Sequence, residues 1–349
     1  TVTSRGYIDQ AAGLILNLRE FYPTAEIVVC ALDAETQRAF AAATDANLVC
    51  VGAADVWGLD YWRNISSRMS VPERAFASKS ALVTWVLETR SRPVLLLDSD
   101  LLFLARTDDM IESLQRHPLL LVPGRHPWDA WRKTANFGLF SAGIIGVAPA
   151  TLSMARSWRA MCFEACMATS LSGLYYEQKY LDYFISVDGL KIFNDPGINV
   201  SQTLLKLLAP RRNEDGSWQV GDGTSLRIYH ASRSTGEEVE LARMKADYNR
   251  RGLAAFGLAE KRAPREQKTG NRVGLAALAR ILRIGSTLEG VSNLLDRMSR
   301  GLITLHRVLT LHDSTLRVRI YETYTQRSRL QATLEKDAYP NADAAIEKR

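Results

Sequence analysis

The sequence predicts an α/β fold in which helices flank a mainly parallel sheet. Three observations support this prediction: short apolar runs alternate with helical patterns, Pro93 precedes the clearest of these runs, and that run ends on two aspartates. Strands that are separated by helices form parallel, doubly wound sheets. Residues 94–97 read Val-Leu-Leu-Leu, a continuous apolar run typical of a strand buried on both faces.

The elements can be placed in order along the chain from hydrophobic spacing and stop signals. Apolar residues at helical spacing are stopped by Tyr22-Pro23, and a β-rich run ends at Asp33. A βα series at the start of a chain suits nucleotide binding. We expect helices over 13–20, 35–44, 76–89, 152–169 and 175–184, and strands over 26–32, 47–51, 94–97, 119–122 and 226–230. We also expect a loop over 128–140 that covers the site. The small residues of segment 141–147 would let its backbone come close to a neighbouring group.

Asp98 and Asp100 follow the strand over 94–97 directly. In open α/β sheets, ligands bind at the carboxyl ends of the strands. Two carboxylates one residue apart are costly there unless a cation compensates them, and a divalent metal would leave positions open for phosphate oxygens. The pattern therefore suggests a metal–diphosphate site, although solvated loops also place acidic residues after strands.

Composition limits the class of protein. The chain has 349 residues, of which 46% are hydrophobic and 23% charged, as in ordinary soluble globular proteins. It contains no apolar run long enough to span a membrane and no basic-then-apolar leader. Cys30 and Cys50 lie in apolar segments, and Cys162 and Cys166 supply too few ligands for zinc. These features favour a reducing, cytoplasmic setting.

The C-terminal quarter differs in charge and pattern from the rest. Residues 260–349 hold 17 lysines and arginines against 10 acidic residues, a net charge of +7, whereas the whole chain carries +6. Residues 261–271 are polar and indicate a linker, and an apolar stripe with 3-4 spacing then runs from Leu288 to Leu309. Docking on the main domain, self-association and contact with an anionic membrane all fit this pattern.

Five motifs in order produce a family resemblance. They are Asp98-x-Asp100, Phe140-Ser141-Ala142-Gly143, Glu177-Gln178-x-x-x-Asp182, Pro196-Gly197-x-Asn199-Val200 and His230-x-Ser232. Together they resemble bacterial GT-A glycosyltransferases near glycosyltransferase family 8, over roughly residues 1–250. The resemblance implies a GT-A-like fold for a catalytic domain over 1–260. The tail lies outside the resemblance, and its charge and apolar stripe predict a basic helical C-terminal extension over 261–349.

The resemblance implies a metal-dependent donor site. Asp98, Asp100 and His230 would bind Mn²⁺ or Mg²⁺, and Asp98 would also touch the donor ribose. An imidazole beside two carboxylates suits Mn²⁺ better than Ca²⁺. The metal would neutralise the leaving nucleoside diphosphate.

Further residues would hold the rest of the nucleotide sugar. Lys79 would face the diphosphate, and Arg233, which stands where many relatives have glycine, could hold phosphate. Ser141 and Gly143 would line the sugar pocket, with Ser141 where relatives often have asparagine. By position alone, Thr3, Tyr7 and Asp33 could bind base and ribose.

The predicted catalytic residues lie in one segment. Glu177-Gln178 matches an Asp-Gln pair in many relatives, and one of the two would face the anomeric carbon. Asp182 would orient Gln178 or contact the acceptor. The resemblance favours retention of anomeric configuration, with the departing phosphate oxygen helping to remove the acceptor proton.

The resulting functional hypothesis is a hexosyltransferase-like enzyme of bacterial polysaccharide biosynthesis. Its donor would be a nucleoside diphosphate sugar, uridine being the commonest base among relatives, and its acceptor a glycan, a glycolipid or a protein. Nucleic acid is not an expected partner. We expect a cytoplasmic protein, with peripheral contact at the inner face of the membrane or homo-oligomer formation through the C-terminal helices as open alternatives.

Two other classes compete with this hypothesis. Phosphatases of the haloacid dehalogenase type also place Asp-x-Asp after a strand, but there the motif stands on the first strand, whereas here it follows some 95 residues. The other rival is a non-catalytic carbohydrate-binding protein on a transferase fold. The presence of Asp98, Asp100 and His230 together argues against a degenerate site.

Overall fold

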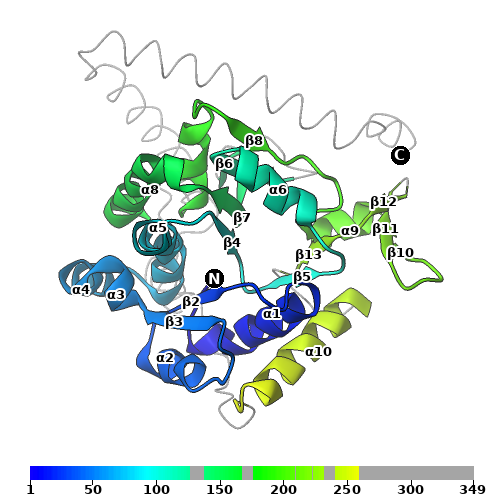
Figure 1. The fold of residues 1–349 in the computed structure, drawn as a ribbon, viewed down its shortest axis with the longest axis horizontal. Coiled ribbons are helices and arrows are strands. Elements are labelled where there is room, and N and C mark those ends of the chain that lie inside the picture. Colours follow the sequence, from blue (N-terminus) through cyan, green and yellow to red (C-terminus); the bar gives the residue numbers. More distant parts are fainter. Residues whose placement is uncertain (126–136, 167–175, 209, 222, 232–239, 259–349) are drawn as a thin grey trace, which may run out of the picture.

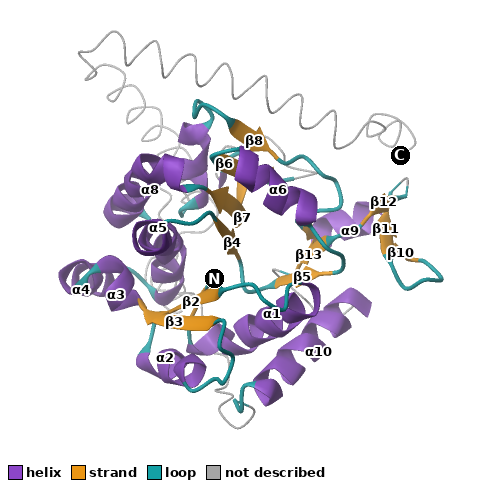
Figure 2. Ribbon diagram, in the orientation of Figure 1, coloured by secondary structure: helices purple, strands orange, loops and turns teal. Residues whose placement is uncertain are grey.

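A computed structural model describes residues 1–125, 137–166, 176–208, 210–221, 223–231 and 240–258 (Figure 1). The predicted linker, the Leu288–Leu309 stripe, the extension over 261–349, most of the predicted covering loop and Arg233 lie outside these residues. Among the described helices, none has both the length and the apolarity needed to cross a membrane. The α/β fold with helices around the sheets is confirmed (Figure 2).

The first sheet is parallel throughout, with strand order β1-β2-β3. The two expected strands lie within a residue of their predicted ends. The first helix begins at Ile8, five residues before its predicted start, and the second ends at Ala41, three residues before its predicted end. Asp33 ends the second strand and caps the following helix by accepting the Thr36 N–H at 2.8 Å. The elements are β1 (Val2–Thr3), η1 (Arg5–Tyr7), α1 (Ile8–Phe21), β2 (Ile27–Ala31), α2 (Ala34–Ala41), β3 (Leu48–Gly52), α3 (Ala53–Trp57) and α4 (Leu59–Arg68).

The second sheet is mixed and has the order β4-β7-β6-β8. The segment of small residues forms β7 at its centre, antiparallel to β4 and β6, while β6 and β8 run parallel. The helix α5 contacts both β1 and β4 and so joins the two sheets. The elements are α5 (Val71–Arg90), β4 (Val94–Leu97), α6 (Asp108–Arg116), β6 (Leu119–Pro123), β7 (Phe140–Val147), η2 (Pro149–Thr151), α8 (Leu152–Ala165) and β8 (Leu190–Ile192).

A third sheet of three short strands brings distant segments together. Its order is β5-β13-β9, with β5 antiparallel and β9 parallel to β13. The strand β5 (Leu101–Phe103) directly follows the two aspartates and was not foreseen as a separate strand. The remaining elements are η3 (Gln178–Phe184), β9 (Val200–Ser201), α9 (Gln202–Leu208), β10 (Arg211–Arg212), β11 (Trp218–Val220), β12 (Thr224–Ser225) and β13 (Ile228–His230).

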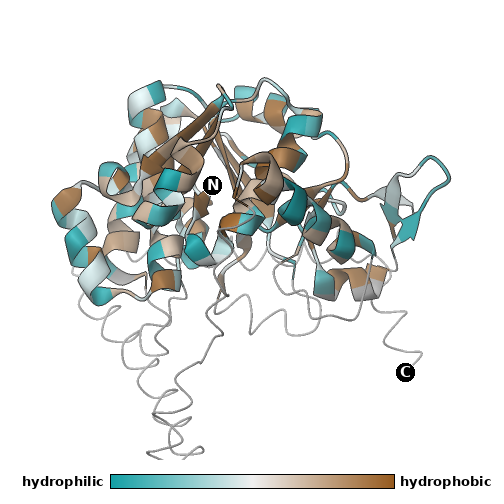
Figure 3. Ribbon diagram, turned by 90° about the horizontal axis from the view of Figure 1, so that it is seen from below, coloured by the Kyte–Doolittle hydropathy of each residue, from teal (hydrophilic) through white to brown (hydrophobic). Residues whose placement is uncertain are grey.

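In the segment expected to be a helix over 175–184, Tyr176 and Glu177 form a turn and Gln178–Phe184 form a 3-10 helix. Its hydrogen bonds close tighter turns than those of an α-helix. Tyr180, Leu181 and Phe184 bury their side chains against the core that α5 and α8 share with the second sheet. The strands of this core are brown in Figure 3, which marks them as hydrophobic.

The last described helix, α10 (Glu240–Ala255), lies beside α1 near the start of the chain (Figure 1). The two backbones approach closely through glycines. A Cβ on Gly13 would lie 2.8 Å from Cα of Asn249, and a Cβ on Gly252 would lie 2.5 Å from the carbonyl oxygen of Ala12. Any larger side chain at either position would force the helices apart, so their separation and register are fixed.

Candidate metal and nucleotide-sugar site

The turn Asp98-Ser99-Asp100 connects β4 to β5 at the carboxyl end of β4. It is held against the centre of the second sheet, because the Asp98 N–H donates to the carbonyl of Gly143 on β7 at 2.9 Å. The Leu101 N–H turns back to the Asp98 carbonyl at 3.3 Å. Both aspartate side chains are half-buried.

His230 reaches the turn because β13 pairs with β5. His230 stands opposite Leu101 in the strand register, one residue beyond Asp100, and the Ala231 N–H donates to the Asp100 carbonyl at 3.0 Å. The imidazole Nε2 lies 3.1 Å from Oδ1 of Asp100. Burial lowers the pKa of His230, but the charge and hydrogen bond of Asp100 together with the charge of Asp98 raise it, and the net shift is upward. For Asp100, burial raises the pKa of the carboxyl, but the imidazole of His230, together with Lys245 and Lys79, lowers it to about 2.

Asp98, Asp100 and His230 together form a donor set that fits a divalent metal. Each offers one ligand atom, and these atoms lie within 4.8 Å of one another. Two carboxylate oxygens and one imidazole nitrogen suit Mn²⁺ or a similar ion. A side chain on Gly143 would crowd the group, since a Cβ there would lie 2.9 Å from Cε1 of His230 and 3.2 Å from Oδ2 of Asp98.

Asn199 contacts the second ring nitrogen of His230. Its Oδ1 lies 2.8 Å from Nδ1 of His230, and its backbone has φ +60°, a left-handed conformation that asparagine tolerates. Two residues earlier, Gly197 lets this loop pack closely on the segment before β13, because a Cβ there would lie 1.8 Å from the Ser225 carbonyl oxygen. The sequence identified the motif around these residues but not the contact with His230.

Lys79, on α5, lies between two carboxylates. Its Nζ is 2.6 Å from Oδ1 of Asp98 and 2.8 Å from Oε1 of Glu177, and its side chain is only 8% exposed. Burial lowers the pKa of this lysine, but the two carboxylates reverse the effect and raise it above its ordinary value. For Glu177, burial outweighs the lysine and raises the pKa of the carboxyl.

The three residues predicted as catalytic lie in η3 or directly before it, next to β7, but in different environments. Glu177 is buried and paired with Lys79, whereas Gln178 is half-buried and accepts the Ala142 N–H at 3.1 Å. Asp182 is buried and accepts the Leu139 N–H at 2.7 Å. Of the three, Gln178 is therefore the most accessible.

The predicted sugar-pocket residues lie on β7. Ser141 is buried, and its hydroxyl accepts the Gly143 N–H at 3.1 Å. This bond, with the one from Asp98 N–H to Gly143, places the centre of β7 directly against the aspartate turn.

The residues assigned to base and ribose meet at the carboxyl edge of the first sheet. Thr3 pairs with Ala31 in the parallel register, so the ends of β1 and β2 coincide. Asp33 bridges them, since its Oδ2 accepts the Arg5 N–H at 2.8 Å and its other oxygen caps α2. Tyr7 is exposed and Thr3 is buried.

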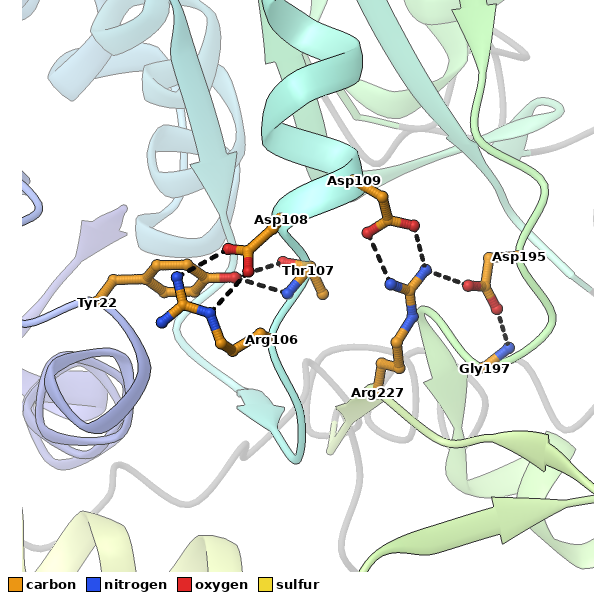
Figure 4. Close-up of polar contacts among 8 residues, drawn as sticks. All are labelled: Tyr22, Arg106, Thr107, Asp108, Asp109, Asp195, Gly197 and Arg227. Atoms are coloured by element: carbon orange, nitrogen blue, oxygen red, sulfur yellow. Dashed lines mark hydrogen bonds and ion pairs between the residues drawn. The ribbon is translucent and has the colours of Figure 1, made fainter.

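Arg227, just before β13, braces the loop that leads to Asn199 (Figure 4). Its guanidinium donates to both oxygens of Asp109 at 2.7 and 3.0 Å and pairs with Asp195. Asp195 in turn accepts the Gly197 N–H at 2.7 Å. The arginine thus connects α6 to the segment that orients His230, a role that the sequence did not reveal.

Comparisons with known proteins place glycosyltransferases among the structural matches. No protein-family model and no curated protein matches the chain. The galactosyltransferase LgtC, in complex with donor and acceptor sugar analogues, matches with 13% identity and a TM-score of 0.46 over 77% of this chain and 98% of LgtC. Mouse xyloside xylosyltransferase 1 matches with 10% identity and a TM-score of 0.40, over 68% of this chain and 98% of its own. GlyE of Streptococcus pneumoniae matches with 14% identity and a TM-score of 0.41, over 76% of this chain and 64% of its own.

Proposed function

We propose that the protein is a metal-dependent GT-A-type glycosyltransferase that transfers a sugar from a nucleoside diphosphate donor. The observation that carries this proposal is the meeting of Asp98, Asp100 and His230 at the carboxyl end of β4, with their ligand atoms within 4.8 Å of one another. Two distant parts of the chain build this donor set, namely the turn between β4 and β5 and the end of β13, which a merely solvated strand end would not require.

Asp98, Asp100 and His230 hold Mn²⁺ or Mg²⁺ in this proposal. When bound, such an ion neutralises the charge that develops on the leaving diphosphate. The chain provides the orientation: the backbone bond from Asp98 to Gly143 fixes the turn, and Asn199 fixes the imidazole. Lys79 holds Asp98 in place and keeps a positive charge next to the diphosphate position.

The donor would extend from the metal in two directions. Thr3, Tyr7 and Asp33 contribute to a pocket for base and ribose, and Ser141 and Gly143 line the sugar. Gln178 faces the anomeric carbon. Glu177 pairs with Lys79, and Asp182 holds the backbone at Leu139. Arg233 contributes to phosphate binding.

The finer assignments follow from the sequence resemblance. The donor is a UDP-sugar, transfer retains the anomeric configuration, and the acceptor is a glycan, lipid-linked glycan or protein in bacterial polysaccharide synthesis. The catalytic domain spans 1–260. The charge and apolar stripe of the extension over 261–349 favour docking on the catalytic domain, self-association or contact with the inner face of the membrane, and the protein works in the cytoplasm.

A thermal-shift screen tests the proposal. We expect the melting temperature to rise with UDP or a UDP-sugar only when Mn²⁺ is present, since a ligand that binds the native state stabilises it. Asp100→Ala should abolish this metal-dependent shift, and Asp60→Ala, at a side chain 94% exposed, should retain it. No shift with any nucleotide and Mn²⁺ would overturn the proposal. Phosphate release from a phosphomonoester would favour the phosphatase instead.

A further inference from the structure

Lys245 is a buried lysine beneath the aspartate turn. It lies on α10 and is only 4% exposed. Its Nζ donates to the carbonyl of Ser99 at 2.9 Å, that of Leu101 at 2.8 Å and that of Gln10 at 3.4 Å. An ammonium group has three hydrogens, so these carbonyls use its full donor capacity.

Two of the three carbonyls belong to the residues on either side of Asp100. The Ser99 carbonyl lies in the peptide unit that directly precedes Asp100, and the Leu101 carbonyl lies in the unit between Leu101 and Leu102. By holding both, the lysine fixes the backbone of the turn from which the Asp100 side chain leaves. Burial lowers the pKa of Lys245 to about 8, with Asp100 and Asp9 opposing the effect, so the amine is mostly protonated at neutral pH.

The position of Lys245 is itself fixed by the helix pair. The close approach of α10 to α1 at Gly13 and Gly252 leaves no room for the helix to shift. The same helix α1 holds the far end of β5, because the Asn17 amide exchanges two hydrogen bonds with the backbone of Phe103, at 3.1 and 2.7 Å. The segment from Ser99 to Phe103 is therefore held at both ends from the α1–α10 pair.

We propose that Lys245 is a positioning residue for the metal site, which it serves by holding the backbone carbonyls of Ser99 and Leu101, the residues on either side of Asp100. The inference rests on the proposed function, because it assigns the lysine a part in the same donor set. The inference goes beyond the proposed function because it makes α10, a helix that supplies no metal ligand, responsible for the geometry of the metal site. Removal of a residue that orients a metal ligand lowers metal affinity by about 10- to 100-fold.

Electron paramagnetic resonance of Mn²⁺ titrated into the full chain tests this inference, because free Mn²⁺ gives a signal that binding broadens. The variants are Lys245→Met, which keeps the length of the side chain, and Lys245→Gln, which keeps a hydrogen-bond donor. Arg243→Met, at an exposed residue of the same helix, is the matched control for loss of a charge. Asp100→Ala marks the complete loss of the site.

We expect wild type and Arg243→Met to bind Mn²⁺ equally, Lys245→Met to bind about 10- to 100-fold more weakly, and Asp100→Ala not to bind. The spectrum of the bound ion should also change in the Lys245 variants at saturating Mn²⁺, because the donor geometry changes. A lysine that only stabilised the fold would leave both affinity and spectrum as in wild type.

Three outcomes would overturn the inference. Wild-type affinity and spectrum in Lys245→Met would refute it while leaving the proposed function intact. Failure of wild type itself to bind Mn²⁺ would refute the proposed metal site and the role of Lys245 with it. If both Lys245 variants fail to fold while Arg243→Met folds, the lysine serves stability alone.

Discussion

The imidazole Nδ1 of His230 lies 2.8 Å from Oδ1 of Asn199, the residue that precedes β9. Because the amide oxygen can only accept, the imidazole donates from Nδ1 and keeps Nε2 directed at Asp100. Histidines that bind metals are commonly oriented in this way through their second nitrogen. The contact therefore selects the tautomer that the proposed metal site needs.

Replacement of Asn199 with glycine should weaken Mn²⁺ binding about 10- to 100-fold, because the imidazole loses the group that orients it. Glycine is the suitable replacement, since it accepts the φ of +60° at this position without strain. Calorimetric titration with MnCl₂ measures the effect, and circular dichroism checks that the fold is retained. Mn²⁺ affinity equal to that of wild type would show that Asn199 does not orient the ligand.

Lys79→Met should destabilise the protein by about 3–5 kcal/mol, because it leaves the buried Glu177 carboxylate without its partner. The double variant Lys79→Met/Glu177→Gln should recover most of this loss, since the buried charge is then removed as well. Urea unfolding measures both changes, and Lys191→Met on β8 serves as the control. Equal stability of the single and double variants would argue against coupling between Lys79 and Glu177.

Gln178→Ala should lower turnover by about a hundredfold while changing donor affinity only slightly, because a polar group that faces the reacting carbon acts mainly in the transition state. Hydrolysis of the donor that the thermal screen identifies gives the turnover number, and calorimetry gives the affinity. The opposite result, with weakened binding and unchanged turnover, would place Gln178 in the nucleotide pocket.

Arg227→Gln should lower the free energy of unfolding at pH 7 by about 1–3 kcal/mol, because two carboxylates lose their partner. It should also flatten the dependence of stability on pH. The Arg227 hydrogen bond depresses the pKa of Asp109 below 3.8, so this pair contributes stability that is present above that pH and lost as the pH falls further.

Urea unfolding of the Arg227 variant and of wild type at pH 7, 4 and 2.5 checks this prediction, because the difference in slope lies below pH 3.8. Arg250→Gln is the control, since its side chain is 80% exposed and its pair with Asp247 is screened by water. A variant whose stability falls with acid as steeply as that of wild type would show that the Arg227–Asp109 pair is not formed in solution.

The sequence predicts the strands whose apolar runs are bounded by clear signals. β2, β3, β4 and β6 all lie within a residue or two of their expected limits. The strand β5 was missed because its three residues continue the apolar run on the far side of the aspartates, and local pattern cannot separate two strands joined by a tight turn. Its partner β13 lies more than 120 residues away, which no periodicity records.

The candidate site could be predicted for side chains with distinctive chemistry. Asp98, Asp100 and His230 were selected from their motifs, and the structure brings them together. Lys245 was missed because a lysine on a helix is ordinarily exposed. The spacing of Leu241, Lys245, Tyr248 and Gly252 places all four on one helical face, and this is the signal that could have revealed a buried lysine.

The bond from Lys245 to the carbonyl of Gln10 joins residues 235 positions apart. Synthesis on the ribosome proceeds from the N-terminus, so the aspartate turn leaves the tunnel well before the lysine that holds it. Contacts of such long range form late and slow folding. A nascent chain that has completed both aspartates and His230 therefore still lacks the support for its turn, and a chain that stops before residue 240 would carry the donor residues without their arrangement.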